Sequence, residues 1–248
     1  MTVHHIFESI RVRENEKILI QSAAGGTGLI AVQYALAKGL DVYATAGSDA
    51  KLEYLAGMGV KHLINYSTHD FKQEILRMTE NKGVDIVINT LSGEAIQKGM
   101  DILAPGGRYV ELAMTGLKNS AKLDLSKFTH NQMFVSIDLR RVMLSDADIV
   151  SKYLKQVSET LAEGRIRPTV GKQFDFSDVI KAYEFISHRE NIGKIVVRNT
   201  ISDSRINEIA DIERKREKEG ISKIVTMLSE RSISLDQAEK FMEERNYE

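Results

Sequence analysis

The chain has 248 residues, of which 42% are hydrophobic, so it can bury a full core and form one large domain with a smaller addition. Its 34 Lys and Arg residues nearly balance its 35 Asp and Glu residues, which excludes a global attraction to nucleic acid or to an anionic membrane. It has no cysteine, and no apolar stretch is long enough for a membrane helix or patterned as a signal peptide. We therefore expect a cytoplasmic protein whose partner is a small molecule or another protein.

The first part of the chain alternates short apolar runs with helical patterns. After residues 1–5 we expect the chain to enter the first strand, 17–21, almost directly, as an apolar run buried on both faces of a parallel sheet. A glycine-rich turn at 24–28 and a helix over 29–38 follow it. The alternation continues and predicts an α/β fold with a doubly wound parallel sheet of the Rossmann type. Its further elements are strands 41–45, 62–66, 84–89, 108–112 and 133–137 and helices 49–58 and 71–79, with a turn at 105–107.

The later part of the chain returns to helices and then changes in composition. An amphipathic helix is predicted over 149–164, a second helix over 177–187 with Ser177 as its N-cap, and a last strand over 194–197. Residues 201–248 carry 9 basic and 12 acidic side chains. We predict a separate charged helical tail there, with helices near 206–230 and 235–244, the second capped by Ser234. This tail is either a solvated appendage or a docking device.

The glycine-rich turn between the first strand and the first helix is the strongest chemical signal. Glycines at this place let backbone amides approach a pyrophosphate at a helix N-terminus, although such turns can also serve only to reverse the chain. The strand before the turn and the helix after it favour a dinucleotide site. Its predicted binding residues are Ala24, Gly25, Gly26, Thr27 and Gly28.

The end of the second strand bears on the choice between NAD and NADP. An acidic residue that binds the ribose 2′-hydroxyl is typical there of NAD sites, and this chain instead continues from Thr45 through Ala46 and Gly47 to Ser48. A 2′-phosphate could be bound by the Ser48 hydroxyl and the Lys51 ammonium, with Tyr66 as a third contact. This favours NADPH. The alternative for Lys51 is an ordinary exposed helix lysine.

The crevice of a doubly wound sheet lies outside the carboxyl ends of its strands. The residues that follow three of the predicted strands should therefore line the nicotinamide half of the site, unless they only fill loops. They are Asn89, Thr90, Leu91, Ala113, Met114, Ile137 and Asp138.

Several motifs make residues 2–199 resemble the medium-chain dehydrogenase/reductase superfamily, and within it the enoyl reductase domains of modular polyketide and fatty acid synthases. The stretch 89–94 (Asn-Thr-Leu-Ser-Gly-Glu) is the most specific of them. The others are 20–28, 105–112, 137–139 and 193–197. The resemblance implies that residues 1–200 are a dinucleotide-binding domain with a short return to a substrate domain.

The resemblance also implies an activity and partners. The implied reaction is hydride transfer from NADPH to the β-carbon of an enoyl thioester on an acyl carrier protein, followed by protonation at the α-carbon. Neighbouring synthase domains would be partners, no metal is implied, and a homo-oligomer is compatible with the sequence.

Two departures from the family pattern limit this expectation. The family's enoyl reductases usually carry a lysine where this chain has Met114, and a thioether cannot donate a proton. The family's substrate domain, with a candidate catalytic tyrosine, precedes the cofactor domain and is absent from this chain, so Asp138 is the candidate that survives from the polar set. Lys118 is either a substitute for the lysine or a solvated loop residue.

These departures leave two alternatives beside the reductase. The chain could be a non-catalytic scaffold module that keeps the reductase fold, an alternative that Met114 favours. It could also be a quinone-oxidoreductase-like enzyme for a small enone, although the stretch 89–94 argues against that.

Overall fold

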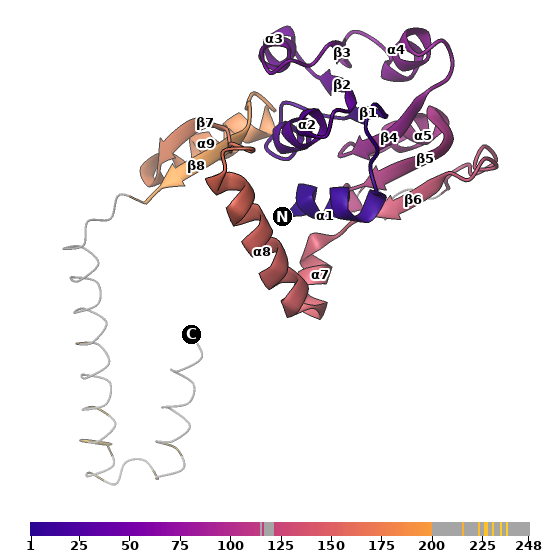
Figure 1. Ribbon diagram of the computed structural model, residues 1–248. Helices are drawn as coiled ribbons and strands as arrows, with labels where there is room; N and C mark the ends of the chain where they lie inside the picture. The colour runs from indigo at the N-terminus through magenta and orange to yellow at the C-terminus, as the bar shows by residue number, and fades with distance from the viewer. Residues whose placement is uncertain are drawn as a thin grey trace. The chain divides into compact units, whose positions relative to one another are not determined.

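The computed structural model of the protein describes residues 1–114, 116, 122–199 and the isolated positions 215, 223, 226, 227, 230, 234 and 237 (Figure 1). The chain divides into two compact units, Met1–Val197 and Arg198–Glu248. Most of the second unit lies outside the described residues, and so do the helices predicted for the tail. At Ser234 the hydroxyl accepts the Gln237 N–H at 3.2 Å, and the Gln237 side chain accepts the Ser234 N–H at 2.9 Å. This reciprocal pair is the capping box expected of an N-cap.

A parallel six-stranded sheet forms the centre of the first unit, in the order β3-β2-β1-β4-β5-β6. Strands β2 and β3 are added outward on one side of β1 and strands β4 to β6 on its other side, so the sheet is doubly wound, which confirms the predicted fold class. The strands are β1 Lys17–Ile20, β2 Asp41–Ala46, β3 His62–Asn65, β4 Val84–Asn89, β5 Leu103–Glu111 and β6 Met133–Ser136.

Helices cover both faces of this sheet (Figure 1). Alternation along β1 directs Ile18 and Ile20 to one face and Leu19 to the other, and all three side chains are fully buried. Each such side chain contributes roughly 1.5–3 kcal/mol of burial free energy. The helices α1 Thr2–Ile10, α2 Gly28–Ala37 and α3 Asp49–Gly57 pack on the first face, and α4 Phe71–Met78 and α5 Glu94–Asp101 on the second.

The chain after β6 adds helices and a small second sheet. Its elements are α7 Leu139–Ser145, α8 Ala147–Ala162, β7 Val170–Asp175, the 3-10 helix η1 Phe176–Asp178, α9 Val179–Ser187 and β8 Lys194–Arg198. Helix α8 lies against α1, where the Tyr153 hydroxyl is 2.9 Å from Nδ1 of His5. Strand β8 pairs with β7 in a separate two-stranded sheet. The predicted last strand is therefore present but does not extend the main sheet.

The expectation that the chain enters its first strand almost directly is wrong. Residues Thr2–Ile10 form α1, because Val3, Ile6, Phe7 and Ile10 follow helical spacing and bury one apolar stripe against the sheet.

Two local predictions are also corrected. The predicted turn 105–107 lies inside β5, where Gly106 has a φ of 72° and the register with β4 shifts between Val84 and Ile86. The segment is therefore an irregularity in a longer strand. Ser177 is not an N-cap, since it lies within η1 and Asp178 stands at the N-cap of α9. The short 3-10 turn moves the helix start by two residues.

A buried ion pair joins the residue before β1 to strand β5. The Arg108 guanidinium donates to the Glu16 carboxylate at 2.9 Å and 2.5 Å, and the two side chains are 7% and 12% exposed. Burial by itself raises the pKa of the Glu16 carboxyl, but the hydrogen bonds from Arg108 and from the Arg13 N–H, with the Arg108 charge, outweigh it and lower this pKa below its usual range.

We expect Glu16→Gln to lower the free energy of unfolding at neutral pH by about 3 kcal/mol, because it leaves the Arg108 charge buried without its partner. Urea denaturation measures this loss. The contribution of Glu16 is present above the ordinary carboxyl pKa of about 4.3 and is lost as the pH falls through its lowered folded-state pKa, so the difference from the parent should shrink in acid. Glu53→Gln on the exposed face of α3 is the matched control. An equal loss in both variants would contradict the assignment.

Candidate functional site

The turn between β1 and α2 presents backbone donors to the crevice. Among the described residues, the N–H groups of Gly26 and Thr27 have no hydrogen-bond partner, and they stand at the N-terminus of α2. Buried Thr45 of β2 holds the start of this turn by two hydrogen bonds. Its hydroxyl accepts the Ser22 N–H at 3.2 Å, and its carbonyl accepts the Ala23 N–H at 2.9 Å. Free amides at a helix N-terminus bind anions.

Glycine is required where the helix passes close to the strand. A Cβ on Gly28 would lie 2.5 Å from the Ala23 carbonyl oxygen, so any side chain would push the start of α2 away from the turn that follows β1. The carbonyl of Ala24 accepts the Gly193 N–H at 2.8 Å, and Gly25 forms a parallel bridge with Gly193. The turn is therefore held rigidly, and its free amides fit the phosphate bridge of a dinucleotide.

The predicted 2′-phosphate residues gather at the end of β2. A Cβ on Gly47 would lie 2.9 Å from the Tyr66 hydroxyl, so this glycine lets Tyr66 approach beside the exposed Ser48. The Lys51 ammonium donates to the Arg189 carbonyl, and burial followed by the nearby Arg189 charge lowers the pKa of Lys51.

The acidic residue next to Ser48 in the sequence already has a hydrogen-bond partner. Asp49 accepts the Asn65 amide at 2.8 Å. The contact of Ser48, Lys51 and Tyr66 with a 2′-phosphate stays a prediction.

The nicotinamide half of the predicted site converges on one cavity. A space of about 400 Å³ at the carboxyl ends of the strands is lined by Thr27, Thr90, Met114, Ile137 and Asp138. These residues come from four different strand ends of the sheet. The structure therefore brings together five residues that were predicted separately.

Met114 and Asp138 both make local contacts in this cavity. The Met114 sulfur accepts the Ser136 hydroxyl at 3.4 Å. The Asp138 carboxylate caps α7 by accepting the Arg141 N–H at 3.4 Å, and it lies 3.5 Å from the Arg141 guanidinium. Asp138 is thus oriented by the start of a helix, with its side chain 32% exposed.

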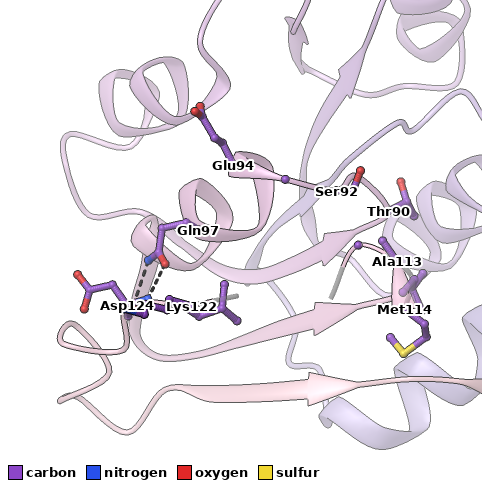
Figure 2. Close-up of a pocket in the computed structure, with 12 residues that line it drawn as sticks. Thr90, Ser92, Glu94, Gln97, Ala113, Met114, Lys122 and Asp124 are labelled. Atoms are coloured by element: carbon purple, nitrogen blue, oxygen red, sulfur yellow. Dashed lines mark hydrogen bonds between the residues drawn. The ribbon is translucent and has the colours of Figure 1, made fainter. Parts of the chain in front are cut away.

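A larger cavity of about 1120 Å³ adjoins the first and shares two of its predicted residues, Thr90 and Met114 (Figure 2). Thr90, Ala113 and Met114 lie on one side, and the polar residues Gln97 and Asp124 lie on the other. A third space, of about 430 Å³, is lined by Tyr66 and Leu91 among others. Open space therefore borders the predicted residues at the ends of β3, β4 and β5.

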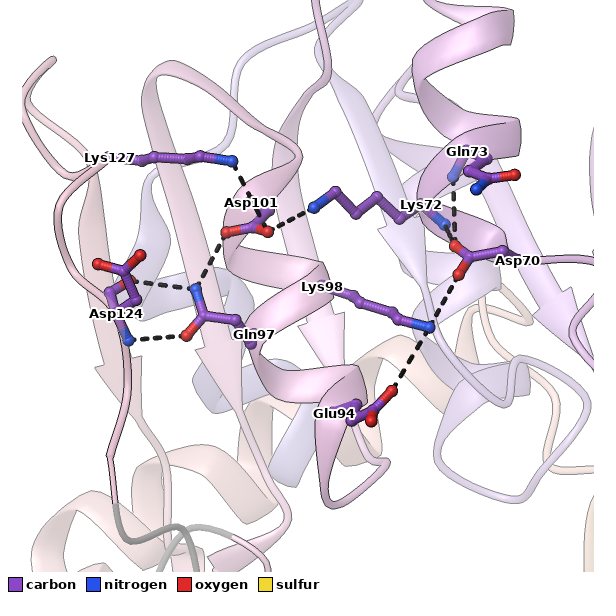
Figure 3. Close-up of polar contacts among 9 residues, drawn as sticks. All are labelled: Asp70, Lys72, Gln73, Glu94, Gln97, Lys98, Asp101, Asp124 and Lys127. Carbon is purple, nitrogen blue, oxygen red and sulfur yellow. Dashed lines mark hydrogen bonds and ion pairs between the residues drawn. The ribbon is translucent and has the colours of Figure 1, made fainter.

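Ion pairs hold α5, which forms one wall of the larger cavity (Figure 3). Asp70 at the N-cap of α4 binds Lys98 of α5 at 2.8 Å, and this hydrogen bond holds the pKa of the Asp70 carboxyl below its usual range. On the opposite side of α5, the Gln97 amide donates to Asp101 at 3.0 Å and its oxygen accepts the Asp124 N–H at 2.8 Å. The wall is thus fixed to α4 and to the segment before β6.

A fully buried carboxyl group ties two strand ends together beneath the site. Glu111 at the end of β5 accepts the Asn89 amide at 2.8 Å, the Tyr109 hydroxyl at 2.9 Å and the Ala113 N–H at 2.7 Å. Asn89 also holds Leu91, through bonds of 2.7 Å and 3.1 Å to its carbonyl and N–H. Burial and then the neighbouring Glu111 charge raise the pKa of Tyr109.

This network refines the roles of two predicted residues. Asn89 is fully buried, and its side-chain amide donates to Glu111 and to the Leu91 carbonyl. It therefore supports Leu91, and its contact with a cofactor stays a prediction. Sequence reasoning assigned no role to Glu111, although a carboxyl group in an otherwise buried strand is a signal for such a network. It also missed Gln21, whose buried side-chain oxygen and nitrogen have no partner in the described part of the chain.

The described residues contain neither a candidate metal site nor a membrane-spanning helix. Within residues 1–114, 116 and 122–199, no three His, Asp or Glu side chains are grouped so that they could hold a metal ion, and no helix is long and apolar enough to cross a bilayer. Lys118 lies outside the described residues.

Comparison with known proteins follows the same part of the chain. A family model described as zinc-binding dehydrogenase matches residues 26–162. A phenolphthiocerol/phthiocerol polyketide synthase from Mycobacterium tuberculosis is 36% identical over 194 residues, which are 78% of this chain and 9% of that protein. The chain therefore spans less than a tenth of this relative.

Two solved structures share the fold at higher coverage. The nucleotide-binding subdomain of the enoylreductase domain of PpsC from Mycobacterium tuberculosis is 38% identical with a TM-score of 0.63, over 67% of this chain and 93% of that one. The CurF ER cyclopropanase from the curacin A biosynthetic pathway is 32% identical with a TM-score of 0.71, over 79% of this chain and 59% of that one.

We expect Glu111→Ala to destabilise the protein by about 3 kcal/mol or more, because two buried donors and one partly buried donor lose their acceptor at once. Tyr109→Phe is the matched variant, and it should cost only about 1 kcal/mol because it removes one donor and keeps the ring. Chemical denaturation of both variants measures the difference. If Tyr109→Phe were as damaging as Glu111→Ala, the carboxyl group would not be the centre of the network.

Proposed function

This chain belongs to the medium-chain dehydrogenase/reductase superfamily, in its branch of polyketide synthase enoyl reductase domains, and we propose that it is the NADPH-binding part of such a reductase. The observation that carries the proposal is the convergence of Thr27, Thr90, Met114, Ile137 and Asp138 on one cavity next to the glycine-rich turn. A cofactor whose phosphates lie on that turn would extend into this cavity.

Different residues of the site bind different parts of the dinucleotide. The amides of Gly26 and Thr27 bind the pyrophosphate, and Ser48, Lys51 and Tyr66 bind the 2′-phosphate. The ends of β4, β5 and β6 orient the nicotinamide ring, with Glu111 holding two of these ends at a fixed separation.

The proposed reaction is reduction of an enoyl thioester carried on an acyl carrier protein. When bound, NADPH supplies a hydride to the β-carbon, and a proton is then added at the α-carbon. Met114 cannot supply this proton, because a thioether carries none. Asp138 is the acidic residue among those that line the cavity, so it is the candidate in this chain for holding or passing a proton there.

The proposed partners follow from the relatives. The chain matches 9% of a polyketide synthase, so neighbouring synthase domains and a carrier protein would surround it in an assembly of that kind. A second function is favoured by one observation, the methionine at the position where the family usually has lysine. It is a reductase-like scaffold module without its own chemistry.

NADPH should raise the unfolding temperature of the full chain, since a ligand that binds the native state stabilises it by mass action. We expect Ser48→Asp to weaken NADPH binding about tenfold or more without weakening NADH binding, because the new carboxylate repels the 2′-phosphate and can accept the 2′-hydroxyl of NADH. Ser151→Asp on the exposed side of α8 makes the same charge change away from the site. A folded chain that shows no thermal shift at millimolar NADPH would refute the dinucleotide assignment.

Activity is tested in a chimera in which the substrate domain of a polyketide synthase enoyl reductase is fused before residue 1. The parent chimera should reduce a crotonyl thioester, and the loss of NADPH absorbance measures the rate. This rate should rise about 10²-fold in Met114→Lys, as expected when general acid catalysis is added. Met114→Leu is the control, because it keeps the size and adds no proton. Turnover that is absent in the parent and appears only with lysine would favour the scaffold function.

A further inference from the structure

Two cavities of the site meet at the end of β5. The smaller one, of about 400 Å³, and the larger one, of about 1120 Å³, are both lined by Thr90, Leu112 and Met114. A ligand whose reacting atoms lie in the smaller cavity can therefore extend past these residues into the larger one. Sites for small molecules measure about 300–1,000 Å³, so the larger cavity has room for a flexible chain.

The larger cavity is lined by apolar side chains next to this junction and by charged ones farther out (Figure 2). The apolar residues are all half-buried, and they are Leu112, Ala113, Met114 and Leu123. The charged residues are all exposed, and they are Glu94, Lys122 and Asp124. An apolar ligand at the junction would remove the accessible surface of the four apolar side chains from water, which is favourable.

Hydrogen bonds and an ion pair fix the walls of the larger cavity (Figure 3). The Gln97 amide of α5 donates to the Asp124 carbonyl at 3.1 Å, and its oxygen accepts the Asp124 N–H at 2.8 Å. Asp101, one turn further along α5, binds Lys72 of α4 at 2.5 Å. The segment that carries Leu123 is thus held against α5, and a ligand does not have to order these walls when it binds.

The proposed reaction gives the two ends of the substrate different surroundings. The α-carbon, which receives the proton, lies between the β-carbon and the thioester, whereas the acyl chain continues from the β-carbon on the other side. Of the two cavities, Asp138 and Arg140 line only the smaller one, and Leu112 and Met114 line both. The polar thioester end therefore matches the surroundings of Asp138, the candidate acid, and the apolar chain matches the junction.

We propose that the larger cavity binds the acyl chain of the thioester substrate and that Met114 forms an apolar wall at its entrance. The inference rests on the proposed function and adds a substrate class, enoyl thioesters with chains longer than crotonyl. It also gives the methionine a role. A lysine would place a charge at the entrance, whereas an unbranched thioether side chain adapts to apolar chains of different shape.

The test measures the dissociation constants of butanoyl, hexanoyl and octanoyl pantetheine for the full chain in the presence of NADPH. These saturated thioesters have the chemistry of the reduced product, so binding is measured without turnover. Each step of two CH₂ groups should tighten binding about tenfold, as expected when both groups leave water.

Two substitutions at the larger cavity should reduce this dependence on chain length. Leu123→Asn makes one wall polar and should weaken octanoyl pantetheine about tenfold while leaving the butanoyl compound and NADPH unchanged. Met114→Lys should also weaken the octanoyl compound more than the butanoyl one, and Met114→Leu should restore its binding. A merely structural role of either residue would change all three constants alike.

Leu125→Asn is the matched control for Leu123→Asn. Leu125 lies two residues further along the same segment, is 54% exposed and does not line the larger cavity. Its substitution should leave all constants unchanged. Unfolding temperatures without ligand show whether each variant is folded.

The outcomes separate this inference from the proposed function. Constants that do not change with chain length in the parent would overturn the inference, and NADPH binding in the same samples would leave the dinucleotide function intact. A dependence on chain length that persists in both Leu123→Asn and Met114→Lys would place the acyl chain elsewhere and would also overturn it. A folded parent that binds neither NADPH nor any of the thioesters would overturn both.

Discussion

The close approach of α2 to β1 is the constraint on which the rest of the site depends. Gly28 packs directly on the backbone of Ala23, and this contact aims the N-terminus of α2 at the crevice of the sheet. Had the helix stood a side chain's width away, its free amides would no longer border the cavity at the strand ends. The same closeness brings the Ala24 carbonyl within reach of Gly193, so that the return segment also depends on it.

A network of buried hydrogen bonds around Glu111 lies beneath the crevice. Glu111 joins the ends of β4 and β5 through groups that would be costly to bury alone. Because each donor has the same acceptor, the two strand ends cannot move independently. Binding surfaces built on loops need such support if they are to hold a planar ring in one orientation. The apolar sheet supplies stability, and this network supplies alignment.

Much of this organisation was predictable from local patterns, and the exceptions have physical reasons. The strand order and the place of the crevice follow from βα alternation, and the predicted bounds of β1 to β4 agree with the structure to within about a residue. Helix α1 was missed although its apolar residues have helical spacing, because a pattern this short before the first strand is easily taken for a loop. The contact of Glu111 with Asn89 could not be predicted, since it joins two strand ends that only the folded chain brings together. Capping residues were predictable at Ser234 and not at Ser177, where a 3-10 turn intervenes.

The contact between α1 and α8 has a consequence for biosynthesis. His5 and Tyr153 form a hydrogen bond, as do His4 and Gln156, so one flank of α1 is completed by a segment made much later. At ribosomal rates of roughly 5–20 residues per second, this flank waits about 7–30 seconds for its partner. During that interval the helix is held only by the sheet and by α2. The flank of α1 that carries His4 and His5 therefore keeps its polar groups in contact with water until α8 is complete.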